Sequence, residues 1–324
     1  MTRAVVFAYH NVGVRCLKVL LAHGVDVALV ITHDDRPGET IWFDSVARTA
    51  ADYGLPVVAP ADPNAAGLVE RVRALEPDFL FSFYYRQMLK PALLELPARG
   101  ALNMHGSLLP HFRGRVPVNW AILKGAHETG ATLHYMTAKP DAGDVVAQQS
   151  VPILPDDTAK EVFDKVTVAA EIALDRVLPA LVHGTAPRIP QPGPGTYFGG
   201  RSAEDGRIDW SQPAAAIHNL VRAVAPPYPG AFCDVSGRRV RVLSTRTIAG
   251  GRAGQTAQAD RGGDATNAGS GAAAIPGGAG LHVTPGGVFA RGGDGGLLAV
   301  RAFDGGEGVP LDAATLAVLL AAEH

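Results

Sequence analysis

Short apolar runs alternate with stretches of helical spacing over the first hundred residues of the chain. Apolar residues fill positions 4–8, helical spacing follows over 14–22, and a second apolar run spans 25–32. A short apolar run is typical of a buried strand, and apolar residues repeated every three to four positions are typical of an amphipathic helix. This order predicts a β-α-β unit with parallel strands.

The same alternation continues to residue 104. We predict helices over 44–53, 65–75 and 87–96, and strands over 56–59, 78–83 and 101–104. The pattern predicts an α/β fold with a Rossmann-like, doubly wound, mostly parallel sheet, in which ligands bind beyond the carboxyl ends of the strands. The first turn, residues 8–13, lacks the three-glycine fingerprint of dinucleotide-binding proteins, so a nicotinamide cofactor is disfavoured there.

Beyond residue 104 the predicted elements become less regular. They are a helix over 116–124, strands over 132–136 and 145–153, and a long helix over 158–182. Pro and Gly are concentrated over 185–200, which indicates a connection between domains. We therefore expect a catalytic domain at 1–190 and a linker at 191–204.

A smaller C-terminal domain is predicted over 205–324. Its elements are a helix over 214–224 and short strands over 231–235, 239–244, 281–283 and 297–301. Short strands separated by glycine turns are typical of a small, OB-like β-barrel. Residues 250–280 are almost entirely Gly, Ala, Asp, Thr and Gln, and they cannot bury enough apolar surface to offset the entropy of ordering. We expect a mobile surface loop there.

Composition and charge restrict the function. The 324 residues are 47% apolar, enough for two cores, because a single core stops growing at roughly 250 residues. No apolar run approaches the roughly 20 residues of a membrane span, and no signal peptide precedes the first strand, so we expect a cytoplasmic protein without a membrane partner. A net charge of -2 disfavours nucleic-acid binding. Cys16 and Cys233 are expected to be reduced, structural thiols.

Candidate chemistry is concentrated at the end of the strand over 101–104. Asn103 and His105 emerge there from an apolar run. With Asp141 they would form a set for acyl transfer to an amine, made of an oxyanion donor, a proton-transfer group and a carboxylate that orients the imidazole. Spacing does not show whether Asp141 reaches His105. Purely structural roles in a strand end and a turn stay open for all three residues.

Two other interpretations of this region have less support. Ser107 lies in a sequence that faintly resembles a hydrolase nucleophile, but position 109 is Leu, so the Gly-x-Ser-x-Gly elbow is absent. A metal site of His10, His105 and His134 would lack paired-ligand spacing, and no metal is expected. Arg115, in the turn after the strand, is a candidate for binding phosphate or carboxylate.

Several motifs resemble those of the folate-dependent formyltransferase family. Residues 103–110 (Asn-Met-His-Gly-Ser-Leu-Leu-Pro), the pair Arg113 and Gly114, and residues 141–144 (Asp-Ala-Gly-Asp) match its core signature. The resemblance implies 10-formyltetrahydrofolate as the formyl donor and co-substrate, a Rossmann-like catalytic domain, and an active site at Asn103, His105 and Asp141.

Further segments look like the branch that formylates UDP-4-amino-4-deoxy-L-arabinose. They are residues 5–10, 81–86, 197–201, 218–224 and 228–232. This resemblance implies a UDP-linked aminosugar as the acceptor, in the pathway that modifies lipid A and confers polymyxin resistance. Bifunctional members carry a decarboxylating dehydrogenase domain. This chain is expected to be a stand-alone formyltransferase, so that another protein supplies the oxidative decarboxylation.

The same resemblance implies binding residues, partners and competing activities. Folate contacts map to Gln87, Met88, Leu89, Thr137, Ala138, Lys139, Pro140 and Asp141, and substrate contacts map to Arg115 and Tyr9. The partners would be small molecules, with a homo-oligomer left open. A methionyl-tRNA formyltransferase shares the core and the barrel, but the near-neutral charge argues against an RNA-binding surface. A formyl-folate hydrolase and an inactive folate-binding module also stay open.

Overall fold

A computed structural model describes residues 1–35, 38–248, 275, 277–306 and 308–322, which form two compact units. Unit 1 comprises Met1–Ala121, Ala126–Ile153 and Glu161–Gly200. Unit 2 comprises Ile122–Gly125, Leu154–Lys160 and Arg201–His324. Most of the loop expected over 250–280 lies outside the described residues.

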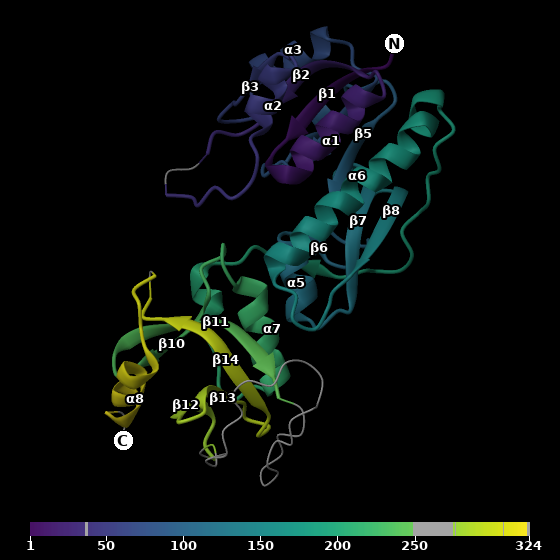
Figure 1. The fold of residues 1–324 in the computed structure, drawn as a ribbon. Helices are drawn as coiled ribbons and strands as arrows, with labels where there is room; N and C mark the ends of the chain where they lie inside the picture. The colour runs from purple at the N-terminus through teal and green to yellow at the C-terminus, as the bar shows by residue number, and fades with distance from the viewer. Residues whose placement is uncertain (36–37, 249–274, 276, 307, 323–324) are drawn as a thin grey trace. The chain divides into compact units, whose positions relative to one another are not determined.

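Unit 1 is built on a seven-stranded sheet with the order β3-β2-β1-β4-β5-β7-β8 (Figure 1). Five strands run parallel, namely β1 (Arg3–Ala8), β2 (Asp26–Ile31), β3 (Val57–Val58), β4 (Phe79–Phe83) and β5 (Ala101–His105). Strand β7 (Glu128–Tyr135) runs antiparallel to both its neighbours, β5 and β8 (Val145–Pro152), and β8 forms one edge of the sheet. Side chains such as Phe7, Leu29 and Leu80 are fully buried. The predicted Rossmann-like, mostly parallel sheet is confirmed.

The helices up to residue 183 follow the predicted order. They are α1 (His10–Ala22), α2 (Val46–Asp52), α3 (Ala66–Ala74), α4 (Pro91–Leu94), α5 (Pro117–Leu123) and, starting in unit 2, α6 (Ala159–His183). The prediction of a helix over 87–96 was too long. Proline lacks an amide hydrogen and is favoured at the first helical position, so α4 begins at Pro91, while Leu89 packs into the core instead. No helix within the described ranges has the length and apolar character of a membrane span.

Residues 191–200 of the segment expected to be a linker belong to unit 1. Its strand β9 (Tyr197–Phe198) pairs in parallel with β6 (Arg113–Gly114), the strand that follows the candidate site. Around this pairing the amide of Arg113 donates to Thr196 O at 2.9 Å, and the amide of Arg115 donates to Phe198 O at 3.0 Å. These two-residue strands lie among Gly, Pro and charged residues, so no hydrophobic period marks them in the sequence.

Unit 2 contains a curled antiparallel sheet with the order β10-β11-β14-β13-β12 (Figure 1). Its elements are η1 (Ala203–Gly206), α7 (Ala214–Val224), β10 (Ala231–Val235), β11 (Arg238–Thr247), β12 (Gly280–Thr284), β13 (Gly287–Arg291), β14 (Leu297–Asp304) and α8 (Ala313–Ala321). Val221, Val240 and Leu298 are fully buried in its core. The smaller barrel-like fold is confirmed as a half-barrel, whereas β13 and α8 were not predicted.

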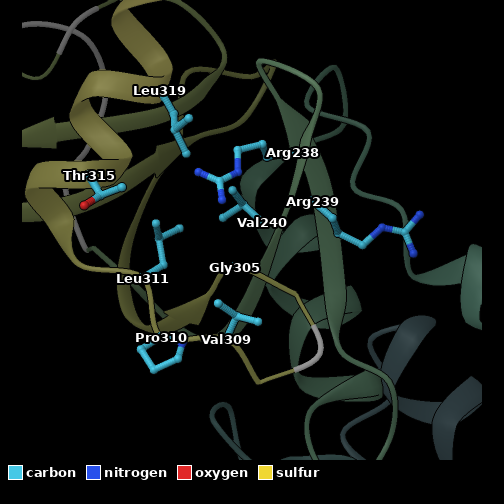
Figure 2. A pocket seen from close by; sticks show the side chains of 9 residues that line it. All are labelled: Arg238, Arg239, Val240, Gly305, Val309, Pro310, Leu311, Thr315 and Leu319. Carbon is cyan, nitrogen blue, oxygen red and sulfur yellow. The ribbon is translucent and has the colours of Figure 1, made fainter.

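One small cavity lies in unit 2 (Figure 2). It has a volume of about 90 Å³ and lies between Arg238 on β11, Val309 in the loop before α8, and Leu319 on α8. Such a volume holds a few water molecules but no folate or sugar nucleotide. None of the predicted site residues lines it. Cys16 in unit 1 and Cys233 in unit 2 are buried and free, as expected.

Candidate active site

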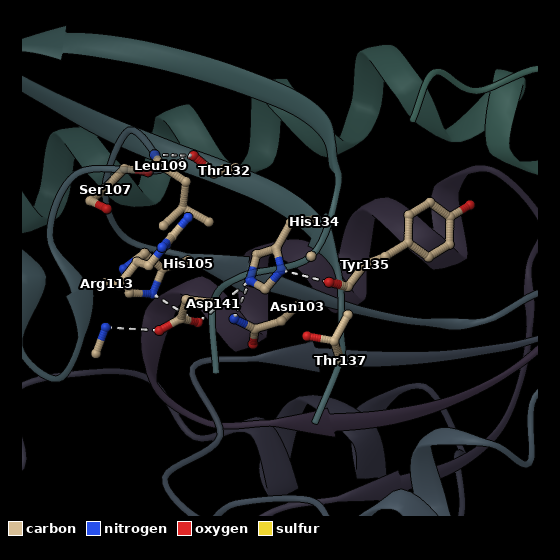
Figure 3. Close-up of polar contacts among 12 residues, drawn as sticks. Asn103, His105, Ser107, Leu109, Arg113, Thr132, His134, Tyr135, Thr137 and Asp141 are labelled. Carbon is tan, nitrogen blue, oxygen red and sulfur yellow. Dashed lines mark hydrogen bonds and ion pairs between the residues drawn. The ribbon is translucent and has the colours of Figure 1, made fainter. Parts of the chain in front are cut away.

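Asn103 at the end of β5 is held by a histidine of the neighbouring strand. Asn103 and His134 are directly opposed in the antiparallel pairing of β5 with β7, and Asn103 Nδ2 lies 3.2 Å from His134 Nε2 (Figure 3). His134 Nδ1 lies 2.8 Å from Tyr135 O. A carbonyl oxygen only accepts, so the neutral ring carries its proton on Nδ1 and accepts at Nε2 from Asn103. One Nδ2 hydrogen of Asn103 is thereby directed at His134, and the other can donate to a ligand.

His105 lies two positions further along β5, at the carboxyl end of the sheet. Its side chain is buried, and Nε2 lies 2.8 Å from Phe112 O. Because that oxygen can only accept, Nε2 carries the proton of the neutral imidazole. Nδ1 lies 3.5 Å from Asp141 Oδ1. Nδ1 is therefore the nitrogen that can take up a proton, and it would then form an ion pair with Asp141.

Asp141 is brought to both histidines by the loop between β7 and β8 (Figure 3). Its Oδ1 lies 3.5 Å from His105 Nδ1 and 3.5 Å from His134 Nε2, and its Oδ2 accepts from the amide of Gly114 at 2.9 Å. Its φ of 52° lies in the left-handed region, which residues with a side chain seldom adopt. The structure thus brings Asn103, His105 and Asp141 together, with His134 between Asn103 and the carboxylate.

The electrostatics favour a neutral imidazole beside an ionised carboxylate. Burial lowers the pKa of His105 below its usual range, although the charge of Asp141 opposes this shift. Burial alone would raise the pKa of Asp141, but attraction to His105 when its imidazole is protonated and the hydrogen bond from the amide of Gly114 hold it below its usual value. His105 is therefore poised to act as a base near neutral pH.

The two competing interpretations of this region lack geometric support. Ser107 is buried, and its hydroxyl donates to His111 O at 2.6 Å, so it is not presented as a nucleophile. His10 stacks against Phe43 with ring centroids 3.9 Å apart. Over the part of the chain that the structure describes, no group of three or more His, Cys, Asp or Glu could hold a metal ion.

The residues expected to contact folate after β4 have different environments. Gln87 is exposed, donates from Nε2 to Ala61 O at 3.1 Å, and lines a cavity of about 250 Å³ together with Arg86. Met88 is 61% exposed. Leu89 is buried in the core of unit 1, so only its backbone could reach a ligand.

The second expected folate segment is the loop that leads to Asp141. Thr137, Ala138 and Lys139 are exposed and Pro140 is half-buried. The hydroxyl of Thr137 donates to Lys139 O at 2.9 Å, so the accessible polar atoms of this loop include its backbone groups and the side chain of the exposed Lys139. This arrangement fits a flat heterocycle bound through main-chain groups.

Arg115 and Tyr9, the two residues expected to contact the substrate, differ in accessibility. Arg115 is exposed, directly after β6. Tyr9 is buried, its hydroxyl donates to Asp35 Oδ1 at 2.7 Å, and Arg86 lies over its ring at 4.4 Å. Burial, together with this hydrogen bond, raises the pKa of Tyr9, so its hydroxyl stays protonated.

Sequence families match both units. A family described as formyl transferase matches residues 12–178, and one described as formyl transferase, C-terminal domain, matches residues 201–303.

Solved structures with a similar fold include the N-formyltransferase of Helicobacter canadensis in complex with folinic acid and dTDP-3-aminofucose. It is 19% identical, with a TM-score of 0.69 over 93% of this chain and 99% of that protein. WlaRD, a sugar 3N-formyl transferase solved with dTDP and 5-N-formyl-THF, is 18% identical, with a TM-score of 0.67 over 92% and 97%. A 4-N formyltransferase from Francisella tularensis is 19% identical, with a TM-score of 0.62 over 75% and 96%. At these identities the likeness shows the fold.

Proposed function

The chain belongs to the formyl transferase family, and on that basis we propose that it transfers the formyl group of 10-formyltetrahydrofolate to the 4-amino group of UDP-4-amino-4-deoxy-L-arabinose. The named activities of the similar structures, sugar N-formyl transfer with folate compounds bound in two of them, support a sugar amine as the acceptor. The motifs in β1, at the end of β4 and in α7 support the UDP-linked sugar. The reaction would serve lipid A modification in the cytoplasm.

The observation that carries the proposal is the buried, neutral His105 whose free Nδ1 faces the ionised Asp141 beside the carboxamide of Asn103. Acyl transfer to an amine needs a group that accepts the amine proton and a donor for the oxyanion. Residues able to serve as both lie at the carboxyl end of β5, the end at which open parallel sheets generally bind their ligands.

The reaction would proceed in two steps. The sugar nitrogen forms a bond to the formyl carbon while His105 Nδ1 takes a proton from it, and the carbonyl electrons move to oxygen. The second Nδ2 hydrogen of Asn103 donates to this oxyanion, and Asp141 stabilises the imidazolium. The bond from carbon to N10 of the folate then breaks, and His105 returns its proton to N10. The products are an N-formyl sugar and tetrahydrofolate.

The donor would be held along the loop that precedes Asp141 and beside the end of β4. The backbone groups of residues 137–140 and 87–89 would hold its heterocycle, with the side chain of Gln87 at the rim. Arg115 would pair with an anionic group of either substrate. Tyr9 is buried with its hydroxyl bound to Asp35 and Arg86 over its ring, so its proposed substrate contact would require Arg86 to move.

An acceptor screen tests the proposal. The purified protein is given 10-formyltetrahydrofolate labelled in the formyl group, with UDP-4-amino-4-deoxy-L-arabinose, dTDP-linked 3-amino and 4-amino sugars, methionyl-tRNA, or no acceptor. We expect label in the UDP-linked aminosugar and none released as formate without an amine. Label in tRNA alone, or formate released at the same rate without any amine, would contradict the proposal.

A further inference from the structure

A single carboxamide joins the loop of Asp141 to a segment 50 positions further along the chain. We propose that Gln191 is a positioning residue that holds Asp141 against His105, so that the carboxylate can stabilise the imidazolium during formyl transfer. This inference rests on the proposed function, and it adds to the site a residue that the motifs of the catalytic strand do not indicate.

All four hydrogen-bonding positions of the Gln191 side chain are occupied. Nε2 donates to Asp141 O at 2.8 Å and to Gly143 O at 2.7 Å. Oε1 accepts from Arg113 Nη2 at 2.7 Å and Nε at 3.1 Å. A guanidinium only donates and a carbonyl only accepts, so the carboxamide has one orientation that satisfies all four bonds.

The loop that Gln191 holds has an unfavourable backbone. Asp141 adopts a left-handed conformation, which tertiary contacts have to maintain. Gly143 lies so close to the backbone of Tyr135 on β7 that a Cβ there would overlap its carbonyl oxygen. The two bonds from Gln191 hold this turn at both ends and so fix the position of Asp141. The carboxylate of Asp141 faces His105 on β5, His134 on β7 and the amide of Gly114 on β6.

Arg113 anchors Gln191 in turn. Its side chain is only 7% exposed, and Nη1 donates to Pro194 O at 3.0 Å. Arg113 itself belongs to β6, next to Gly114, whose amide binds Asp141 Oδ2. Strand β6 therefore contacts Asp141 in two ways. The backbone amide of Gly114 binds it directly, and the side chain of Arg113 reaches it through Gln191. A substitution that breaks only the contacts of Gln191 with the loop can therefore distinguish a role in positioning Asp141 from a role in folding.

Gln191→Glu is that substitution. Glutamate keeps the oxygens that accept from Arg113, but it loses both donors to the loop. In the ligand-free protein we expect the amide of Gly114 to exchange with solvent at least about tenfold faster, because its acceptor is Asp141 Oδ2. The neighbouring amide of Arg115, which donates to Phe198 O, should keep its protection.

Gln149→Glu on β8 is the matched control. Gln149 accepts from Arg176 Nη1 at 2.8 Å and donates to Ser150 O at 3.0 Å, so the same change is made in the same kind of contact away from Asp141. It should alter neither exchange at Gly114 nor turnover. Unchanged protection of Gly114 in Gln191→Glu would overturn the proposal, whatever the activity.

A double-mutant cycle with Asp141→Asn supplies the kinetic test. In the wild-type background Gln191→Glu should lower kcat about ten- to hundredfold, with less than a threefold change in KM. In the Asp141→Asn background it should cost nothing further, because Gln191 acts through that carboxylate. Equal losses in both backgrounds would show a general structural role and overturn the proposal. If the wild-type protein formylated no amine, the proposed function would fail, and exchange at Gly114 would still decide the positioning.

Discussion

Two regions of unit 1 meet at Asp141 by different routes. The ends of β5 and β7 present Asn103, His105 and His134 from regular strands, where pairing and alternation determine which side chains meet. The segment 191–198 reaches Asp141 through Gln191, which donates to its backbone carbonyl, and through the pairing of β9 with β6. In the proposed mechanism the first region would provide reacting groups, and the second provides backbone and side-chain contacts that hold Asp141.

The difference shows how chemistry and positioning are divided in this fold. Strand-end side chains are placed by the core beneath them, which includes fully buried residues such as Leu102. Asp141 lies in a loop and not on a strand, so its position depends on polar contacts with residues that are far away in the sequence. We therefore expect substitutions in the first region to lower turnover, and substitutions in the second to lower stability or to act through Asp141.

The largest effect should follow from Asn103→Ala. It removes the proposed oxyanion donor, and the loss of one such donor costs about 100- to 1,000-fold in kcat. Steady-state kinetics with the preferred aminosugar measure it, and a thermal unfolding transition near that of the wild type shows that the variant is folded. Near-normal turnover in a folded variant would remove Asn103 from the mechanism.

His134→Phe should have the next largest effect. It keeps a ring on β7 but removes the nitrogen that accepts from Asn103, and a misplacement of about 1 Å costs about 100-fold in rate. The control is His127→Phe, at an exposed position just before β7, which should leave kcat unchanged. Equal rates for the two variants would mean that Asn103 is held without His134.

Gly195→Ala tests the second region. Gly195 has a φ of 66°, and a Cβ there would overlap the carbonyl oxygen of Pro110. Gly193 has a φ of 64° with no atom within 4 Å of such a Cβ, so Gly193→Ala introduces only the backbone strain. Denaturant unfolding should show that Gly195→Ala loses about 1–3 kcal/mol more than Gly193→Ala. Equal losses would show that this segment is not packed against the turn after β5.

Thr196→Val should have the smallest effect. It removes the hydroxyl that accepts from the amide of Phe112 at 2.8 Å while keeping the shape of the side chain. The free energy of unfolding should fall by about 0.5–1.5 kcal/mol, with kcat within a factor of two. A large loss of turnover instead would indicate that the segment takes part in the chemistry directly.

The elements that could be predicted from the sequence are those with a hydrophobic period. The sheet from β1 to β5, its helices and the polar pair at the end of β5 all follow from apolar spacing, and the length of α4 was wrong because a proline and a buried Leu89 interrupt the pattern. β6 and β9 have only two residues each, too few to show a period, and β13 has only three apolar residues between glycine-rich turns.

The site was partly predictable for the same reason. Asn103 and His105 lie two positions apart on one strand, whereas His134 becomes a neighbour only once β7 pairs with β5. The sequence alone suggests His134 only as a metal ligand, because its neighbour on β5 follows from the pairing register and not from spacing along the chain. Gln191 has no local signal, because its partners lie far away in the sequence and its role depends on a left-handed Asp141.

The pH dependence of kcat/KM, compared between the wild type and Asp141→Asn with the same aminosugar, tests the central claim most directly. His105 must be neutral to accept a proton, so activity should fall as the pH drops through its pKa. Asp141 raises that pKa, so its removal should move the acidic limb to lower pH, on a lower plateau. Acidic limbs at the same pH, or a limb moved to higher pH in the variant, would contradict the pairing of His105 with Asp141 on which the account rests.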